Sequence, residues 1–101
     1  MEQTIRQAIE ERRPLSLRYE TTGAAPRRVH PQVLFRAANG TLCLDGYQVG
    51  GATSSGERLP DWRQLDLTKI SAVEPLEGTF APAPGLNRRA DKYAGGLIAC
   101  V

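Results

Sequence analysis

The sequence has too few cysteine and histidine residues for a metal site. It contains one histidine, His30, and two cysteines, Cys43 and Cys100, with no CxxC pair. A structural zinc site takes four cysteine or histidine ligands, so this chain cannot build one alone. A disulfide between the two cysteines is not expected in a reducing compartment. We therefore expect no metal and no cofactor.

Long apolar segments are also missing. No apolar run approaches the about 20 residues that a membrane-spanning helix needs. The segment from Met1 to Arg13 carries charges throughout, unlike a signal peptide. We therefore expect a cytoplasmic protein without a membrane partner.

The sequence lacks the motifs of an enzyme as well. A catalytic nucleophile needs a base that a third group orients, and one histidine with scattered serines offers no such arrangement. The glycine-rich residues 50–56 lack the Gly-Lys-Ser/Thr ending of a phosphate-binding P-loop. Ser54 and Ser55 are not part of a G-x-S-x-G motif. We expect no catalytic residues and no enzymatic activity.

The composition fits one small globular domain. The chain has 101 residues, a length typical of a single domain. Its net charge of +2 is too small to indicate nucleic-acid binding. Only Lys69 and Lys92 of the thirteen basic residues are lysines. Arginine makes bidentate contacts with phosphates and carboxylates, but GC-rich coding produces the same bias, so arginine content alone assigns no ligand.

Residues 3–12 are predicted to form a helix. Ile5, Ala8 and Ile9 fall on one face at helical spacing. Thr4 and Gln7 have the spacing of a capping box, which would mark the start of the helix. A helix this short is marginal in isolation, so it must pack on the rest of the domain.

Alternation of apolar and polar residues predicts about five strands. The expected strands are residues 15–19, 28–36, 41–48, 62–67 and 70–76. In the second strand, Val29, Val33 and Phe35 are expected to share one face, with Arg28 and His30 on the other. Residues 50–60 are predicted to be a long, flexible hairpin loop. Antiparallel strands in this number close most readily into a small barrel, which removes exposed sheet edges.

The C-terminal quarter of the chain is predicted to contain little regular structure. Residues 77–101 begin with several prolines and glycines, and we expect an ordered loop that crosses the surface. The apolar residues 97–101 are expected either to pair as a strand or to pack on the barrel. We treat residues 1–101 as a single domain with its core in residues 5–76.

Four of the predicted segments together resemble the WYL domain family. The matching segments are residues 15–19, 28–31, 39–47 and 63–70. The block R-x-L-x-L-x-K-I from Arg63 to Ile70 is the best match, because the family usually has R-x-F-x-L-x-R-I there. The sequence departs from the family at residues 42–44, where Leu-Cys-Leu replaces the name-giving Trp-Tyr-Leu, and at Lys69, where arginine is usual.

The resemblance implies a mainly β fold: a small SH3-like or Sm-like barrel of about five antiparallel strands with a short N-terminal helix. It also implies a ligand-binding regulatory module that recognises a nucleotide or single-stranded nucleic acid. Many bacterial members of the family regulate transcription. The family domain commonly follows a DNA-binding helix-turn-helix domain, which this sequence does not contain, so DNA binding would come from a partner protein.

We expect the ligand site at an arginine-rich rim of the barrel. By parity, Arg63 and Lys69 lie at the two ends of an inward face whose middle is Leu65 and Leu67. Long basic side chains at such positions reach outward while their stems pack. The hypothesis assigns ligand contacts to Tyr19, Arg28, His30, Tyr47, Arg63 and Lys69.

Simpler interpretations exist for these residues. Tyr19 and Trp62 are often packing residues rather than stacking surfaces. Arg63 can pair with Asp61 or Asp66 on a solvated ladder. For the whole domain, the alternative function is a protein-interaction or oligomerisation module without its own ligand, because open strand edges pair into homo-oligomers.

Overall fold

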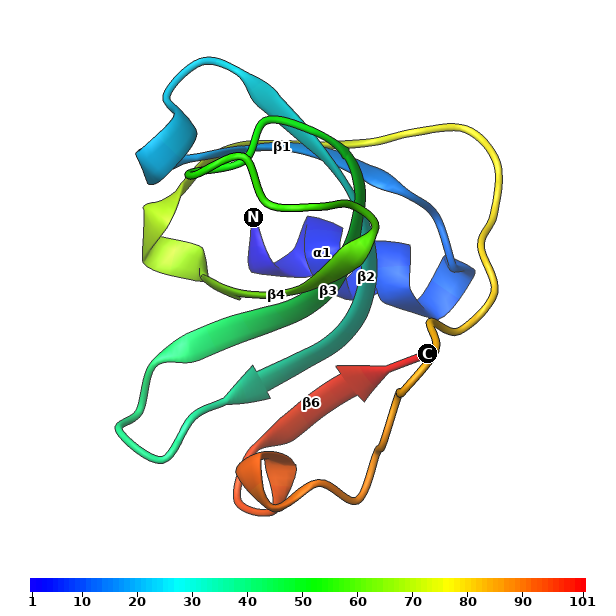
Figure 1. The fold of residues 1–101 in the computed structure, drawn as a ribbon. Helices are drawn as coiled ribbons and strands as arrows, with labels where there is room; N and C mark the ends of the chain where they lie inside the picture. The colour runs from blue at the N-terminus through cyan, green and yellow to red at the C-terminus, as the bar shows by residue number, and fades with distance from the viewer.

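One antiparallel sheet organises the chain (Figure 1). The computed structural model describes residues 1–101. Its elements are α1 (Glu2–Glu11), β1 (Leu15–Tyr19), η1 (Glu20–Thr22), β2 (Pro26–Arg36), β3 (Leu42–Gly51), β4 (Asp61–Asp66), η2 (Leu67–Lys69), β5 (Ile70–Pro75), η3 (Asp91–Tyr93) and β6 (Leu97–Cys100). The predicted mainly β fold with an N-terminal helix is confirmed, and the apolar C-terminal residues do form a strand.

The sheet curls into a barrel that is not closed. Its strand order is β4-β3-β2-β1-β5, and β6 pairs with the far part of β2. The two end strands, β4 and β5, are not hydrogen-bonded to each other. The chain passes from β4 into β5 through the three residues of η2, so the strands follow one another around a corner instead of forming a hairpin. The expected full closure is therefore wrong at this one seam.

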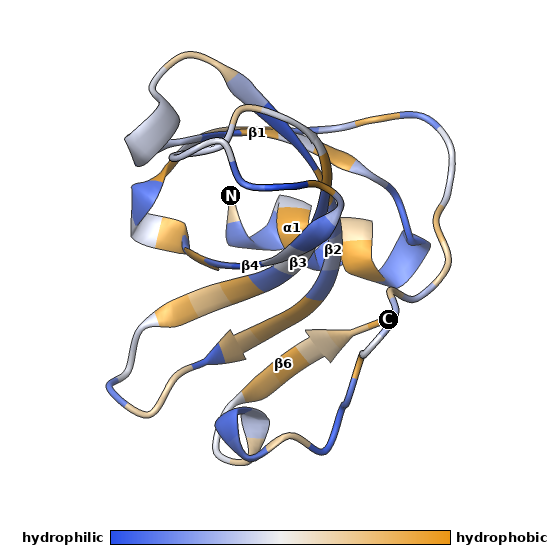
Figure 2. Ribbon diagram, in the orientation of Figure 1, coloured by the Kyte–Doolittle hydropathy of each residue, from blue (hydrophilic) through white to orange (hydrophobic).

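The helix α1 packs its apolar face against the sheet, as its spacing predicted. Ile5, Ala8 and Ile9 are buried in the main core, and Figure 2 shows this contrast between apolar and polar residues of α1. The capping-box prediction is wrong, because the helix already begins at Glu2 and Thr4 lies inside it. No helix of the chain is long and apolar enough to cross a membrane.

Strand β2 changes the face that its side chains occupy at a β-bulge. Pro31 and Val33 pair with neighbouring residues of β3, which leaves Gln32 as an extra residue. One extra residue reverses the alternation of all later side chains. Val29 therefore packs in the main core, whereas Val33 and Phe35 lie on the opposite face. The prediction that these three residues share one face is wrong for this reason.

The side chains beyond the bulge form a second, smaller core under the C-terminal segment. This outer core consists of Val33, Phe35, Cys43 and Tyr93. The ring of Phe35 meets the ring of Tyr93 edge to face, with 4.9 Å between centroids. The side-chain oxygen of Gln32 accepts a hydrogen bond from the backbone N–H of Ala83 at 3.0 Å. The C-terminal segment is thus fixed to β2 at both positions.

Strand β4 ends one residue before its predicted end, at Asp66. The Asp66 carboxylate accepts a hydrogen bond from the backbone N–H of Thr68 at 2.9 Å, and this bond caps η2. Because the strand ends at Asp66, Lys69 does not continue the face of Arg63 and Leu65, and its side chain is exposed. Leu65 and Leu67 both lie in the main core, as expected, whereas the expected position of Lys69 on the same face is wrong.

Candidate ligand-binding site

A buried arginine lies at one end of the barrel interior. Arg27 of β2 is only 3% exposed. Its guanidinium donates hydrogen bonds of 3.0–3.3 Å to Thr21, Thr22, Gln48 and Ser54. It also lies over the ring of Tyr19, 5.2 Å from the ring centroid. These partners offset much of the cost of burying a charged group.

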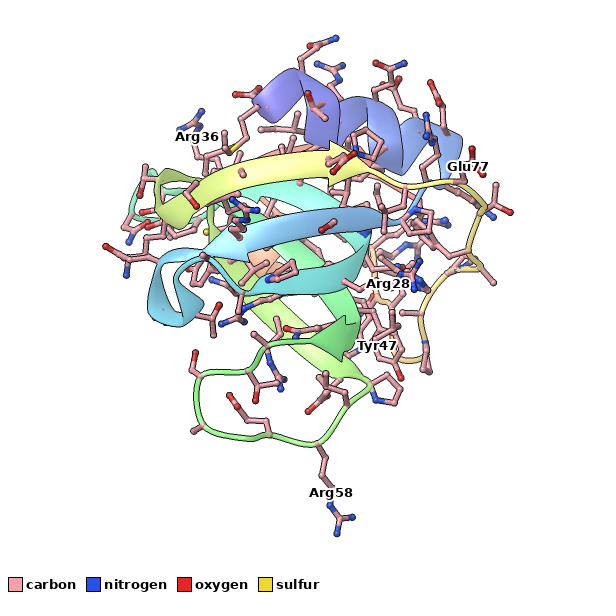
Figure 3. The ribbon with its side chains drawn as sticks, turned by 90° about the horizontal axis from the view of Figure 1, so that it is seen from above. Arg28, Arg36, Tyr47, Arg58 and Glu77 are labelled. Carbon is pink, nitrogen blue, oxygen red and sulfur yellow. The ribbon has the colours of Figure 1, made fainter.

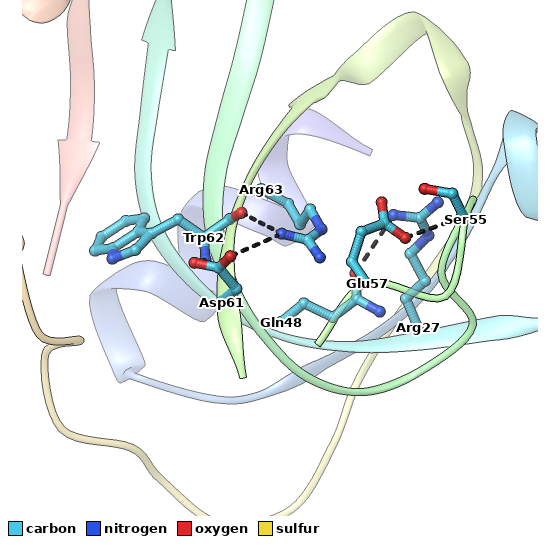
Figure 4. A network of polar contacts seen from close by, with 7 residues as sticks. All are labelled: Arg27, Gln48, Ser55, Glu57, Asp61, Trp62 and Arg63. Carbon is cyan, nitrogen blue, oxygen red and sulfur yellow. Dashed lines mark hydrogen bonds and ion pairs between the residues drawn. The ribbon is translucent and has the colours of Figure 1, made fainter. Parts of the chain in front are cut away.

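A second arginine, Arg63 of β4, reaches into the same end of the barrel (Figure 4). Its Nη1 donates to the carbonyl of Trp62 at 2.7 Å and lies 3.5 Å from a carboxylate oxygen of Asp61. Its Nε and Nη2 are buried and have no hydrogen-bond partner. These two nitrogens form one edge of the guanidinium, the kind of edge that holds a carboxylate or phosphate with two parallel bonds. Arg63 therefore carries an unused anion-binding edge.

Two arginines and the carboxylate of Glu57 set the electrostatics of this region. Burial lowers the pKa of Arg27, the nearby carboxylate of Glu57 opposes that shift, and the positive charge of Arg63 adds to it. Glu57 belongs to the β3–β4 loop, where backbone N–H groups of its own residue and of Ser55 hold the pKa of its carboxyl at about 2. We call Arg27, Gln48, Glu57 and Arg63 the arginine cluster.

Two of the predicted site residues belong to this region. Arg63 is a member of the arginine cluster, and Tyr19 lies beneath the guanidinium of Arg27. The hydroxyl of Tyr19 accepts a hydrogen bond from the backbone N–H of Asp66 at 3.0 Å, across the open seam of the barrel. Lys69 lies apart, exposed in η2.

The other three predicted residues lie on the outer face of β2 and β3. Arg28 is exposed and lies near Tyr47 (Figure 3). His30 stacks on Phe80 with 4.8 Å between ring centroids, and burial, followed by the positive charge of Arg28, lowers the pKa of His30. Tyr47 meets Trp62 edge to face at 5.9 Å. The structure therefore divides the predicted patch between two faces of the sheet.

Sequence reasoning missed Arg27 and Gln48. The alternation of side chains in a strand could have identified both. Arg27 lies two residues before the inward Val29, and Gln48 pairs with Val29 across the two strands, so both share its face. Arginine and glutamine are usually exposed, so neither residue stood out as an interior group.

The family model for the WYL domain matches residues 2–75 of this chain. No curated protein and no solved structure matches it. The matched residues cover most of the chain and include α1 and all strands from β1 to β5, whereas β6 lies outside the match. The chain belongs to the WYL domain family.

Proposed function

We propose that this chain is a ligand-binding regulatory module that recognises the phosphate of a nucleotide or of single-stranded nucleic acid through the arginine cluster. The unpartnered Nε and Nη2 edge of Arg63 carries this proposal. A buried donor without a partner costs about 1–3 kcal/mol, so a bound phosphate would recover stability that the free protein lacks. Membership in a family of regulatory, ligand-sensing modules supports the same function.

The β3–β4 loop would have to move when the anion enters. The unused nitrogens of Arg63 are buried, so no anion reaches them in this conformation. Ser54 of this loop is held by Thr21 at 2.8 Å and by Arg27 at 3.1 Å. These two hydrogen bonds hold the Ser54 side chain, and a bound anion that replaces them would release the loop.

Binding rather than catalysis is the role we propose. Arginine keeps its proton in proteins, so the arginine cluster can hold an anion but supplies no general acid or base. We further propose that the domain acts in the cytoplasm and that a partner protein supplies any DNA binding.

Titration of labelled single-stranded oligonucleotides and free nucleotides over a salt series tests the proposal. Wild-type affinity should fall steeply as salt rises, because phosphate contacts release counterions. Arg63→Met should weaken binding about 10-fold or more, since it removes a charged bidentate donor. Arg6→Met is the matched control, because Arg6 is exposed on α1 and pairs only with Glu10. Equal binding by wild type and Arg63→Met would contradict the proposal.

One observation favours the oligomerisation alternative. Strand β6 is paired with β2 only, and its Leu97 is 48% exposed. An oligomerisation module would gain mass with concentration in light scattering, without a response to oligonucleotides, and Leu97→Glu would return it to monomers. A constant monomer mass would exclude this function.

A further inference from the structure

A second polar site lies around Asp45 of β3, on the outer face of the sheet. Asp45 is only 2% exposed. Its Oδ2 accepts a hydrogen bond from the Tyr93 hydroxyl at 2.5 Å and pairs with the Lys92 ammonium at 2.5 Å. Its Oδ1 is buried and has no partner. The site therefore holds a hydrogen-bond acceptor that the protein itself does not use, and a side chain of the lining has to move before a ligand reaches it.

A cavity of about 250 Å³ adjoins this carboxylate. Trp62 and Gln64 of β4 form one wall, and Asn87 and Lys92 of the C-terminal segment form another. The indole N–H of Trp62 donates to the carbonyl of Pro84 at 2.8 Å, which fixes the ring beside the cavity. Because Asn87 and Lys92 lie beyond the residues matched to the family, this cavity depends on a segment outside the family match.

The charges around the cavity argue against a cationic ligand. The negative charge of Asp45 is already paired with the ammonium of Lys92. A further cation would meet the positive charge of Lys92, which also lines the cavity. A neutral group with an N–H donor would satisfy Oδ1 without that repulsion.

The volume of the cavity limits the size of the ligand group that it can hold. Its volume of about 250 Å³ lies below the roughly 300–1,000 Å³ of sites for drug-sized molecules. A compact, flat ring therefore suits it, and the indole of Trp62 offers a flat surface for stacking. The ligand group should be small, planar and uncharged, with an N–H that reaches a carboxylate.

We propose that this cavity binds a nucleobase that carries an exocyclic amino group, whose N–H donates to Oδ1 of Asp45 while the ring lies against Trp62. Adenine, cytosine and guanine meet this description. The proposal rests on the proposed function and deepens it, because a nucleotide or a nucleic acid carries bases as well as phosphates.

A matched pair of nucleosides tests the base site on the unaltered protein. Adenosine and purine riboside differ by the exocyclic amino group and carry no phosphate. Calorimetry should give adenosine an affinity about 10-fold or more above that of purine riboside, because only adenosine donates to a buried carboxylate. The indole N–H signal of Trp62 should shift on saturation. Equal affinities, or no saturable binding of either nucleoside, would overturn the proposal.

Two variants locate the binding. Asp45→Asn should remove the difference between adenosine and purine riboside, since an amide can turn a donor toward the ligand. Trp62→Leu should weaken both nucleosides by a similar factor, because it removes the flat wall. If Asp45→Asn fails to fold, the base site is still tested by Trp62→Leu and by the comparison of the two nucleosides on the wild-type protein. Discrimination that survives both variants would place the base elsewhere.

A third ligand separates this inference from the proposed function. Ribose 5-phosphate carries a phosphate without a base, so its binding reports the arginine cluster. Binding of ribose 5-phosphate without preference for the amino group of adenosine would refute the base site and leave the proposed function standing. A preference for the amino group without binding of ribose 5-phosphate would refute the phosphate proposal and retain the base site.

Discussion

At the scale of single residues, Arg27 and Arg63 find very different surroundings within one cluster. Each of the three guanidinium nitrogens of Arg27 donates a hydrogen bond, whereas two buried nitrogens of Arg63 have no acceptor. Desolvation without a partner is unfavourable. Arg27 therefore supports the fold, while Arg63 weakens it and keeps a binding capacity.

This contrast predicts that methionine at position 27 and methionine at position 63 change the free energy of unfolding differently. Arg27→Met should lower the free energy of unfolding by about 1–3 kcal/mol, because it strands polar partners such as Gln48. Arg63→Met should leave that free energy unchanged or raise it slightly, because it removes unpaired donors. Urea unfolding of both variants measures the difference. A larger loss in Arg63→Met than in Arg27→Met would show that Nε and Nη2 of Arg63 have partners in solution.

Glu57 gives a prediction for the acid range. Its pKa lies at about 2 instead of the ordinary 4.5, so its charged form stabilises the folded loop. This contribution is fully present above about pH 4.5 and is lost as the pH falls toward 2. NMR titration of the Glu57 carboxyl should give a midpoint near 2, and Glu57→Gln should flatten the stability profile between these values. A midpoint at the ordinary value would mean that the bond from Ser55 does not persist.

At the scale of elements, the packing of side chains between the paired strands β2 and β3 depends on a glycine. A Cβ on Gly46 would lie 2.3 Å from Cγ1 of Val29, inside the main core. Overfilling a packed core costs about 1–3 kcal/mol. The two strands can therefore approach this closely only because residue 46 has no side chain.

A double-mutant cycle tests that close contact. Gly46→Ala should lower the free energy of unfolding by about 1–3 kcal/mol, and Val29→Ala should lower it through the lost core volume. The double variant should be more stable than the sum of the two losses predicts, because each change makes room for the other. Thermal unfolding of the four proteins gives the coupling energy, and strict additivity would contradict the proposed clash.

Most elements of the fold were predictable from the sequence, because period-two alternation marks strands and spacing marks α1. The bulge at Gln32 was predictable only in part. Pro31 indicates an edge or a bulge in this strand, but the alternation does not show which residue is extra. The early end of β4 was also hidden, because it depends on the side chain of Asp66 capping the next turn.

The sites were less predictable than the fold. Arg63 was identified through its motif, but its neighbour Arg27 has a residue type that is rarely buried. Asp45 is buried beneath Lys92 and Tyr93, which lie 47 and 48 residues further along the chain. No local pattern can reveal such partners.

At the scale of the whole molecule, the C-terminal segment completes a domain that the family match leaves unfinished. Residues beyond 75 supply Phe80 and Val101 to the main core and Tyr93 to the outer core. They also supply the only ammonium that pairs with Asp45. Without them, the apolar side chains of the outer core and the carboxylate of Asp45 would be exposed on the outer face of β2 and β3.

A chain that ends at Leu76 should therefore lose cooperative unfolding, because it lacks parts of both cores. Tyr93→Phe should cost only about 1–3 kcal/mol, since it removes one hydrogen bond to Asp45 and keeps the ring. Near-ultraviolet circular dichroism and urea unfolding measure both effects. An unchanged unfolding midpoint in the shortened chain would show that residues 2–75 fold alone.

The bulge in β2 has a consequence for how this domain can diverge. Because the strand reverses its alternation at Gln32, Arg27 and Val29 face the barrel interior, whereas Val33 and Phe35 face the covering C-terminal segment. Changes in the covering segment can then be absorbed by the outer core with little disturbance of Arg27 and Arg63. The same scaffold can thus acquire a new outer pocket while its inner anion site stays as it is.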